Sequence, residues 1–495
     1  MKLFFLIPFA AATVFAGAPA MKCDALAARP FGDDVKIQSA SLVAAKGNLP
    51  EHCDVRGVIF PEAQFALKIP TQWNDRFQMV GNGGTAGTIS MGAVDGAVRK
   101  GFASVSTDTG HDAKKEELAT FARESPENPN ARRKFLDFAY LSVHETAVLA
   151  KKMITAYYGA APKYSYWVGC STGGRQGMQE AQRYPDDFDG LVIGAPGLYN
   201  TGNNVRRMWL AHSQLGDAEL PVTKLPLLAK KIYEKCDPAD GLKDGVIEDP
   251  RQCKFDARRD LPICLSADGP ECFTAAQAEG IYKIHSGVRN SYGQFLFPGE
   301  PVGAESLWND NVLGPAKTVL PRAISQLKYF FLDPSPGDNW TYTQFNFDTD
   351  PPRMMRNGSI VNAMNTDLAP LKKRGGKIVH YSGWADQQVN PMPGIDYYNA
   401  VSKRLGETET RDFYRLFMVP GMFHCSGGPG CSSADWLEAT MNWVEKGMAP
   451  ETILGSHMEG GKATRTRPLC NYPAIAKYKG SGSIEEAANF SCVAP

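Results

Sequence analysis

Short apolar runs, several of them ending in glycine, alternate along this chain with stretches whose apolar residues have helical spacing. Runs of this length bounded by glycine or proline favour buried strands, whereas the spacing within residues 136–158 favours a helix. Strands that alternate with helices predict a mostly parallel, doubly wound sheet. The expected strands are residues 65–70, 76–80, 102–107, 164–168, 188–194, 377–381 and 416–419, after a β-rich segment that extends to about residue 60.

One interval is too long to belong to this alternation. Residues 197–375 lie between two expected core strands and exceed any ordinary connection within an α/β unit. They hold four cysteines, many prolines and a dense set of aromatic residues. We expect a lid domain over residues 197–375, inserted into a catalytic domain formed by residues 21–196 and 376–495. Its aromatic side chains, taken singly, are expected to form the core of the lid rather than to contact a substrate.

The amino-terminal residues have the pattern of a secretory signal. Met1-Lys2 precedes an apolar run over residues 3–15, and residues 16–20 offer small-residue cleavage sites. The run is too short to span a bilayer stably, although a signal-anchor is the alternative. Residues 1–20 are therefore predicted to be a signal peptide, and the protein is predicted to be secreted or periplasmic.

Overall charge limits the classes of partner. The chain of 495 residues has 53 basic and 53 acidic side chains and a formal net charge of zero. Nothing in this balance indicates a nucleic acid or an anionic membrane as partner. The length suffices for a large core and more than one lobe, and the sequence gives no indication of the oligomeric state.

The strongest chemical signal lies in residues 164–177. Their strand leads directly into a G-x-S-x-G sequence, residues 169–173, and a helix-forming run follows over residues 178–183. This order predicts a nucleophile elbow, in which the glycines allow close packing around a strained turn and Ser171 projects from its tip. The alternative is an ordinary glycine-rich turn with an incidental serine.

A nucleophilic serine needs a base and a group that orients the base. His424 follows a buried strand that ends in a proline-glycine turn, and Asp386 follows another strand and a glycine turn. The order Ser171, Asp386, His424 is that of an α/β-hydrolase triad. His144 and His380 are rival bases, but one lies in an expected helix and the other in an expected strand.

If the protein is exported, its eleven cysteines are expected to form disulfides, because disulfides persist in oxidising compartments. Cys170 precedes Ser171 and Cys425 follows His424. If the two catalytic side chains come within about 3 Å, these neighbours could approach the separation that a disulfide requires. Two small buried hydrophobic residues are the alternative. Spacing further suggests, without fixing the connectivity, the pairs Cys23–Cys53, Cys236–Cys253, Cys264–Cys272 and Cys470–Cys492, which leaves Cys431 single.

An acidic turn lies within the expected lid. Asp237, Asp240 and Asp244 place three carboxylates in a short glycine-containing segment, a layout that suits a hard cation. The spacing differs from that of an EF-hand. From chemistry alone, a solvated acidic turn is an equal alternative to a calcium site.

Three separated motifs, residues 169–177, 381–386 and 420–425, resemble those of the tannase/feruloyl esterase family, and the resemblance extends over essentially the whole mature chain. It implies an α/β-hydrolase core with a large lid, the triad Ser171–His424–Asp386, and a disulfide between Cys170 and Cys425. It also implies a structural calcium ion, Ca2+, in the lid loop. By this resemblance, the ligands of the ion would be the side chains of Asp237, Asp240 and Asp244 and the carbonyls of Leu242 and Val246.

The predicted activity is that of a serine esterase that forms an acyl-enzyme. The N–H of Thr172 and an N–H from the Gly83-Gly84 loop are expected to form the oxyanion hole. The resemblance implies small-molecule esters of aromatic acids as substrates, of the feruloyl type, with galloyl esters or mono(2-hydroxyethyl) terephthalate as alternatives. A serine carboxypeptidase and a catalytically silent binding protein are the other classes considered. The lid arginines that could meet a substrate carboxylate, although solvation is their ordinary role, are Arg206, Arg207, Arg322, Arg353 and Arg356.

Overall fold

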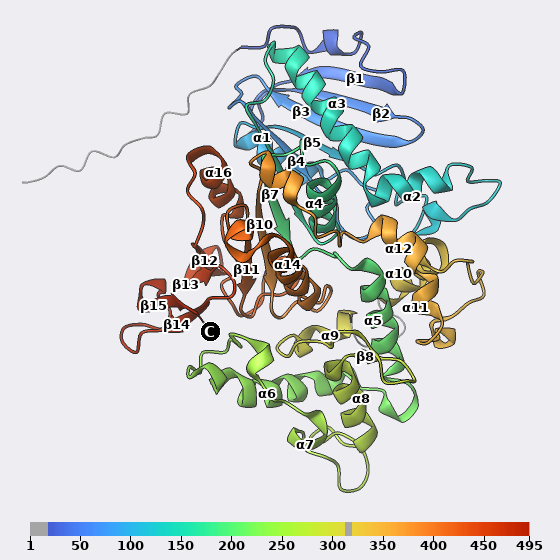
Figure 1. Ribbon diagram of the computed structural model, residues 1–495, viewed down its shortest axis with the longest axis vertical. Helices are drawn as coiled ribbons and strands as arrows, with labels where there is room; N and C mark the ends of the chain where they lie inside the picture. The colour runs from blue at the N-terminus through green and yellow to red at the C-terminus, as the bar shows by residue number, and fades with distance from the viewer. Residues whose placement is uncertain (1–17, 312–318, 495) are drawn as a thin grey trace, which may run out of the picture.

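The computed structural model of the protein describes residues 18–311 and 319–494. Most of the expected signal peptide, residues 1–17, lies outside the described residues. The centre of the described chain is a nine-stranded sheet with the order β1-β2-β3-β5-β4-β6-β7-β10-β11 (Figure 1). Its strands are β1 (Val35–Val43), β2 (His52–Ile59), β3 (Ala63–Pro70), β4 (Arg76–Val80), β5 (Ala103–Thr107), β6 (Tyr164–Cys170), β7 (Gly190–Gly194), β10 (Lys377–Gly383) and β11 (Tyr414–Val419).

The sheet is mixed and mostly parallel. At one side of the sheet, β2 pairs antiparallel with β1 and with β3, and β3 pairs antiparallel with β5. From β5 onward, β4, β6, β7, β10 and β11 pair parallel with their neighbours. Every residue of β5, β7 and β11 is buried, as expected of strands that are covered on both faces.

Helices cover both faces of the parallel part. Alternate residues of β11 show this division: Leu416 packs in the cluster that holds α14, whereas Phe417 packs with Trp436 and Trp443 of α16. Successive side chains of a strand point to opposite faces, so α14 and α16 lie on different sides of the sheet. The doubly wound fold expected from the sequence is confirmed. The helices of this part are α1 (Met91–Arg99), α2 (Ala131–Ala139), α3 (Leu141–Tyr158), α4 (Thr172–Arg183), α14 (Met392–Leu405), α15 (Glu407–Arg411) and α16 (Trp436–Lys446).

The single helix expected over residues 136–158 is wrong in one respect, because two helices occupy this stretch. They meet at Tyr140, where φ is −165° and ψ is −30°. The carbonyls of Phe138 and Ala139, at the end of α2, accept hydrogen bonds of 2.9 and 2.7 Å from the buried guanidinium of Arg175. A side chain from α4 thus satisfies carbonyls that a continuous helix would bond internally.

Residues 197–375, called the insert below, contribute no described strand to the nine-stranded sheet. Part of the insert packs against α2 through a cluster that includes Phe138 and Phe330, and another part has its own core around Ile232 and Trp308. In Figure 1 the helices α5 to α9 lie together below the sheet. The α-helices and strands of the insert are α5 (Asn200–His212), α6 (Leu225–Cys236), α7 (Ala257–Asp260), α8 (Ala275–Ser286), β8 (Val288–Arg289), β9 (Phe295–Phe297), α9 (Trp308–Asn311), α10 (Val319–Gln326), α11 (Asp350–Arg353), α12 (Met355–Val361) and α13 (Ala369–Lys373).

Two hairpins end the chain, β12 (Thr452–Glu459) with β13 (Lys462–Cys470) and β14 (Ile475–Tyr478) with β15 (Phe490–Val493). Five disulfides join the pairs that spacing and position suggested, and Cys431 is a buried free thiol. Within the described ranges, no helix has the length and apolar character needed to cross a membrane.

Candidate active site

Ser171 lies at the turn between β6 and α4. Its φ of 63° and ψ of −120° are a conformation that a non-glycine residue adopts at a cost of about 1–3 kcal/mol. Backbone hydrogen bonds hold it there: the Ser171 amide donates to the carbonyl of Gly194, and the Ser171 carbonyl accepts from the amide of Arg175, each at 3.0 Å. A strained serine at a strand-to-helix turn is the local geometry of a nucleophile elbow.

Two glycines make this turn possible. A Cβ atom at Gly169 would lie 2.6 Å from the carbonyl oxygen of Gly173, and one at Gly174 would lie 2.3 Å from the carbonyl oxygen of Gly194. Both distances are far below van der Waals contact. Larger residues would therefore force α4 away from β6 and β7, and Ser171 would move with it.

His424 and Asp386 lie on the loops that follow β11 and β10. The Nδ1 atom of His424 is 2.8 Å from Oδ2 of Asp386, whose other oxygen accepts from the amides of Gln388 and Val389 at 2.9 and 2.8 Å. The Asp386 carboxylate is fully buried, and the imidazole of His424 is 11% exposed. A fixed carboxylate on Nδ1 leaves Nε2 of His424 as the atom that can exchange a proton.

The two rival histidines have other partners. His144 bonds through Nδ1 to Asp187 at 2.6 Å and stacks on Tyr184. His380 is fully buried inside β10, where its ring nitrogens contact the hydroxyls of Tyr414 and Ser382. Burial lowers the pKa of His380 to about 3, so this imidazole stays neutral.

A disulfide joins the two loops that carry the serine and the histidine. Cys170 ends β6 immediately before Ser171, and it is bonded to Cys425, which follows His424. The two Cα atoms lie 6.0 Å apart across a sequence separation of 255 residues. Segments that the whole insert separates in sequence are thus covalently held side by side.

The loop after β4 abuts the start of α4. The hydroxyl of Thr172 donates to the carbonyl of Gly84 at 2.5 Å, and nothing would obstruct a Cβ atom at Gly83. Asn82 and Gln176 hold the two segments together through two hydrogen bonds of 3.0 Å. The expected oxyanion donors therefore lie on adjoining backbone segments. The sequence analysis did not single out Asn82 and Gln176, whose side chains position these two segments. The feature that could have indicated them is a carboxamide residue within each glycine-rich stretch.

The insert holds the Asp386 loop from two directions, which the sequence analysis did not foresee. The guanidinium of Arg206 donates to the carbonyls of the two residues after Asp386, at 3.0 and 3.1 Å, and pairs with Glu300. Arg251 stacks over the ring of Trp384, two residues before Asp386, at 4.8 Å. Side chains of the insert thus contact the chain on both sides of Asp386.

Asp237, Asp240 and Asp244 lie in one turn after α6. Asp237 accepts from the amide of Asp244 at 3.2 Å, and Asp244 accepts from the amide of Val246 at 3.1 Å and from Arg467 at 2.7 Å. Partial burial, followed by the charges of Asp244 and Asp237, raises the pKa of Asp240. The donors are all oxygens and suit calcium chemically, although in the described chain these carboxylates do not gather within 4.8 Å of one another.

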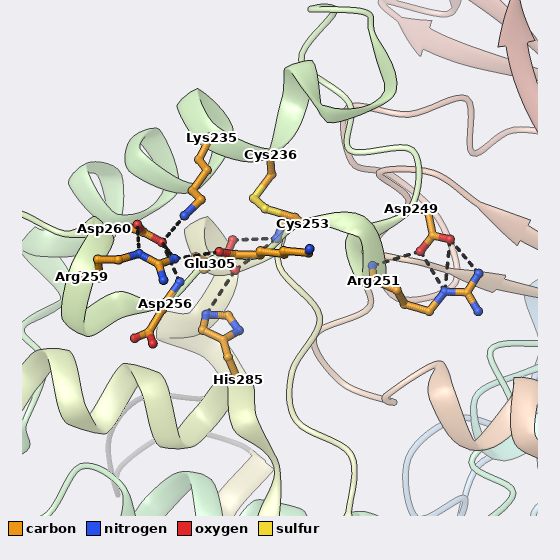
Figure 2. The surroundings of a disulfide bond; sticks show 12 residues. Lys235, Cys236, Asp249, Arg251, Cys253, Asp256, Arg259, Asp260, His285 and Glu305 are labelled. Carbon is orange, nitrogen blue, oxygen red and sulfur yellow. Dashed lines mark hydrogen bonds and ion pairs between the residues drawn. A yellow bond between two sulfur atoms is a disulfide. The ribbon is translucent and has the colours of Figure 1, made fainter.

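The acidic turn also touches the segment that leads to His424. A Cβ atom at Gly421 would lie 3.3 Å from the side chain of Val246. A cavity of about 600 Å³ lies beside the turn, lined among others by Asp240, Asp244, Pro420 and Arg467. Figure 2 shows the neighbouring Cys236–Cys253 disulfide between the ion pairs Lys235–Asp260 and Arg251–Asp249. The turn is distant in sequence from Ser171, Asp386 and His424, but it is adjacent in space to the segment that leads to His424.

A second group of ligand atoms lies on α3, α4 and the loop after α4. Among the described residues, His144, Glu180 and Asp187 each bring one potential metal-ligating atom, all within 4.8 Å of one another. Both oxygens of the buried Glu180 carboxyl lack a hydrogen-bond partner. Burial, and then the adjacent charge of Asp187, raises the pKa of Glu180 well above its ordinary value. This buried group could hold a metal, and it shares no residue with the expected triad.

Comparison with known proteins identifies the family of the chain. Residues 48–493 match the family described as Tannase and feruloyl esterase. An uncharacterized esterase from Xanthomonas campestris is 35% identical, covering 90% of this chain and 85% of its own. Mono(2-hydroxyethyl) terephthalate hydrolase from Piscinibacter sakaiensis is 34% identical, covering 92% and 87%. The crystal structure of feruloyl esterase B from Aspergillus oryzae is 26% identical, with a TM-score of 0.84 over 95% of this chain and 99% of that one.

The mostly parallel sheet, its helical layers and these relatives define a carboxylic ester hydrolase with an α/β-hydrolase-like fold. The chain belongs to the tannase and feruloyl esterase family. The family expected from the three sequence motifs is confirmed.

Proposed function

We propose that the protein is a serine esterase that hydrolyses small-molecule esters of aromatic carboxylic acids through Ser171, His424 and Asp386. One observation carries this proposal: the imidazole bonded to Asp386 belongs to a loop that a disulfide ties to the residue before the strained serine. Family membership supports the ester as the bond attacked.

In the first step, Ser171 Oγ attacks the ester carbonyl while Nε2 of His424 takes the hydroxyl proton. The buried Asp386 carboxylate holds the imidazole and stabilises its charged form. The developing oxyanion accepts hydrogen bonds from the N–H of Thr172 and from an N–H of the Gly83-Gly84 loop. When the intermediate collapses, the alcohol leaves with the proton from His424, and the acid stays bound to the serine as an acyl-enzyme.

In the second step, water attacks the acyl-enzyme. His424 takes a proton from the water and returns it to Ser171 Oγ as the intermediate collapses, so the free aromatic acid is released and the enzyme is restored. The base must reach both serine and water. The Cys170–Cys425 bridge supports this by restricting the separation of their loops.

We propose the feruloyl type as the substrate class, with galloyl esters and mono(2-hydroxyethyl) terephthalate as alternatives that the names of family relatives support. A rate comparison on methyl ferulate, methyl gallate and mono(2-hydroxyethyl) terephthalate, with Ser171→Ala as control, tests the proposal. Hydrolysis of at least one ester, lost in the variant, is expected. Release of amino acids from peptides without ester hydrolysis would indicate a carboxypeptidase. Absence of turnover with retained ligand binding would indicate a silent binding protein.

We further propose that residues 197–375 form a lid domain over a catalytic domain of residues 21–196 and 376–495, and that residues 1–20 direct the protein to a secreted or periplasmic location. Five disulfides favour an oxidising compartment. Full-length expression followed by amino-terminal sequencing of the exported protein tests the cleavage site.

A structural calcium ion is the cofactor we propose for the acidic turn. The carboxylates of Asp237, Asp240 and Asp244 and the carbonyls of Leu242 and Val246 would hold it. A divalent cation would offset the mutual repulsion that contributes to the raised pKa of Asp240. Because the turn contacts the segment before His424, the ion would also stiffen the approach to the base.

A further inference from the structure

Three potential metal ligands meet where α3, α4 and the loop before β7 come together. His144 lies in the first turn of α3, Glu180 lies near the end of α4, and Asp187 lies in the loop that leads to β7. One ligand atom of each residue lies within 4.8 Å of the ligand atoms of the other two. A group of this span can close around one ion, because bonds from zinc to nitrogen or oxygen are about 2.0–2.2 Å long.

The carboxyl of Glu180 is the member of this group that points most directly to a ligand. The residue is 1% exposed, and neither of its oxygens has a hydrogen-bond partner in the part of the chain that the structure describes. The ammonium of Lys151 donates to the backbone carbonyl of Asp187 instead. Because a buried carboxylate is costly unless it is paired or bound to a metal, two adjacent carboxyls at this place favour a bound cation.

His144 is already oriented toward the two carboxyls. Its Nδ1 atom lies 2.6 Å from Oδ2 of Asp187, and its ring stacks on Tyr184 with the two ring centres 3.6 Å apart. The side chain of His144 is 28% exposed and that of Asp187 is 9% exposed, so an ion can enter from the side of the imidazole. The ion would take the place of the proton between Nδ1 and Oδ2. These two atoms would then separate by roughly 1 Å, to the spacing that ligands of one zinc ion have.

We propose that His144, Glu180 and Asp187 form a structural site for a divalent transition metal, with zinc as the expected ion. An imidazole nitrogen together with carboxylate oxygens is a ligand set that zinc accepts, whereas calcium takes oxygen ligands. The ion would join α3 to the end of α4 and to the loop before β7. Because α4 begins directly after Ser171, the ion would stabilise the helix that follows the candidate nucleophile without contacting that serine. The site is independent of the proposed function.

The test measures zinc binding by the untagged protein. The protein is stripped with a chelator and dialysed against zinc with calcium in excess, so that zinc does not bind the acidic turn of the insert. Elemental analysis should find about one zinc ion per chain. Zinc should also raise the melting temperature by a few degrees, because an ion that binds only the folded state stabilises it by mass action.

Glu180→Gln and His144→Gln are the variants that remove a ligand. Each should weaken zinc binding by more than about 10–100-fold, which is the loss that follows mutation of a group that merely orients a ligand. Each should also lose the rise in melting temperature. Asp186→Asn is the matched control, because it removes an exposed carboxylate next to Asp187, and it should bind zinc as the wild type does. His144 is partly exposed, so His144→Gln should fold even if Glu180→Gln does not.

Cobalt(II) provides a second measurement on the wild-type protein. Cobalt held by few nitrogen and oxygen ligands absorbs visible light, so a band should appear on titration and disappear when zinc displaces the cobalt. Zinc retained equally by His144→Gln would show that the ion binds elsewhere, and it would overturn the site. A wild-type protein that binds neither ion, with a melting temperature that does not respond to zinc, would also overturn it. Glu180 and Asp187 would in that case share a proton instead of an ion.

Discussion

The carboxyl edge of the sheet and the insert contribute to the candidate site by different physical means. At the sheet edge, backbone pairing sets the positions: Ser171 is held through main-chain hydrogen bonds, and Asp386 accepts two backbone amides. The insert acts through long side chains, with Arg206 on the loop after Asp386 and Arg251 stacked on Trp384. Backbone-built positions change little when one side chain is replaced, whereas contacts made by single side chains can be altered one at a time. We therefore expect changes at the sheet edge to act mainly on turnover. Changes in the insert should act mainly on stability, and on turnover where a side chain holds the loop after Asp386.

The largest effect should follow removal of the nucleophile or the base. Ser171→Ala and His424→Ala should each lower kcat by at least about 10⁴-fold, because the two residues act as a unit. The melting temperature should stay close to that of the wild type, since backbone bonds define the turn. His457→Gln, on β12, serves as the control and should keep nearly full turnover. A His424→Ala enzyme with near-normal kcat would contradict the assignment.

Removal of the Cys170–Cys425 bridge should have the next largest effect, because the bridge contributes both to the stability of the fold and to the spacing of Ser171 and His424. In the chain-entropy account a loop of 255 residues corresponds to roughly 5 kcal/mol of stabilisation. A displacement of about 1 Å between nucleophile and base can lower the rate about a hundredfold. In Cys170→Ala/Cys425→Ala, the free energy of unfolding measured in urea and kcat should therefore both fall.

Cys264→Ala/Cys272→Ala is the matched control for that experiment. Its bridge closes 8 residues within the insert, which corresponds to roughly 2–3 kcal/mol, and it should leave kcat unchanged. Peptide mapping without reductant gives an independent check. A free thiol at Cys170 or Cys425 in the native enzyme would rule the bridge out.

Arg206→Gln should give an intermediate effect, since it removes two hydrogen bonds from the Asp386 loop and leaves Glu300 buried without its partner. Breaking a buried ion pair on one side costs about 3–5 kcal/mol. The double variant Arg206→Gln/Glu300→Gln should recover much of the stability but not the lost kcat. If both variants keep wild-type kcat, Arg206 supports the fold alone and does not position the acid.

The smallest effect we expect is that of calcium removal. Ligands that bind only the folded state raise its stability by mass action, so chelation should lower the melting temperature by a few degrees. Asp240→Asn should reduce the response to EDTA. An unchanged melting curve together with no metal in elemental analysis would contradict the calcium site.

Local features of the sequence predicted the core strands, the glycine-rich turn around Ser171 and the order of the candidate site residues. These predictions depend on neighbouring residues and on the rule that parallel strands end at one edge of the sheet. The break at Tyr140 could not be predicted in this way, because the guanidinium that satisfies the carbonyls at the end of α2 belongs to Arg175 on another helix.

The same limit applies to the arginines of the insert. Arg206 and Arg207 are adjacent in sequence, yet one pairs with Glu300 and the other has no described partner. Helix geometry points successive side chains in different directions. Arg206 therefore meets Glu300 and the loop after Asp386, whereas Arg207 lies near Arg322 of α10. The pairing of Asn82 with Gln176 likewise depends on two segments that are far apart in the chain.

The Cys170–Cys425 bond turns the chain between these two residues into a closed ring from which both chain ends extend. One broken peptide bond within that ring, for example in the insert, opens it without dividing the molecule. The segments that carry Ser171 and His424 would stay joined through sulfur, and the two fragments would separate only after reduction. In an environment rich in proteases, a cut that would split an open chain into two pieces leaves this one a single molecule.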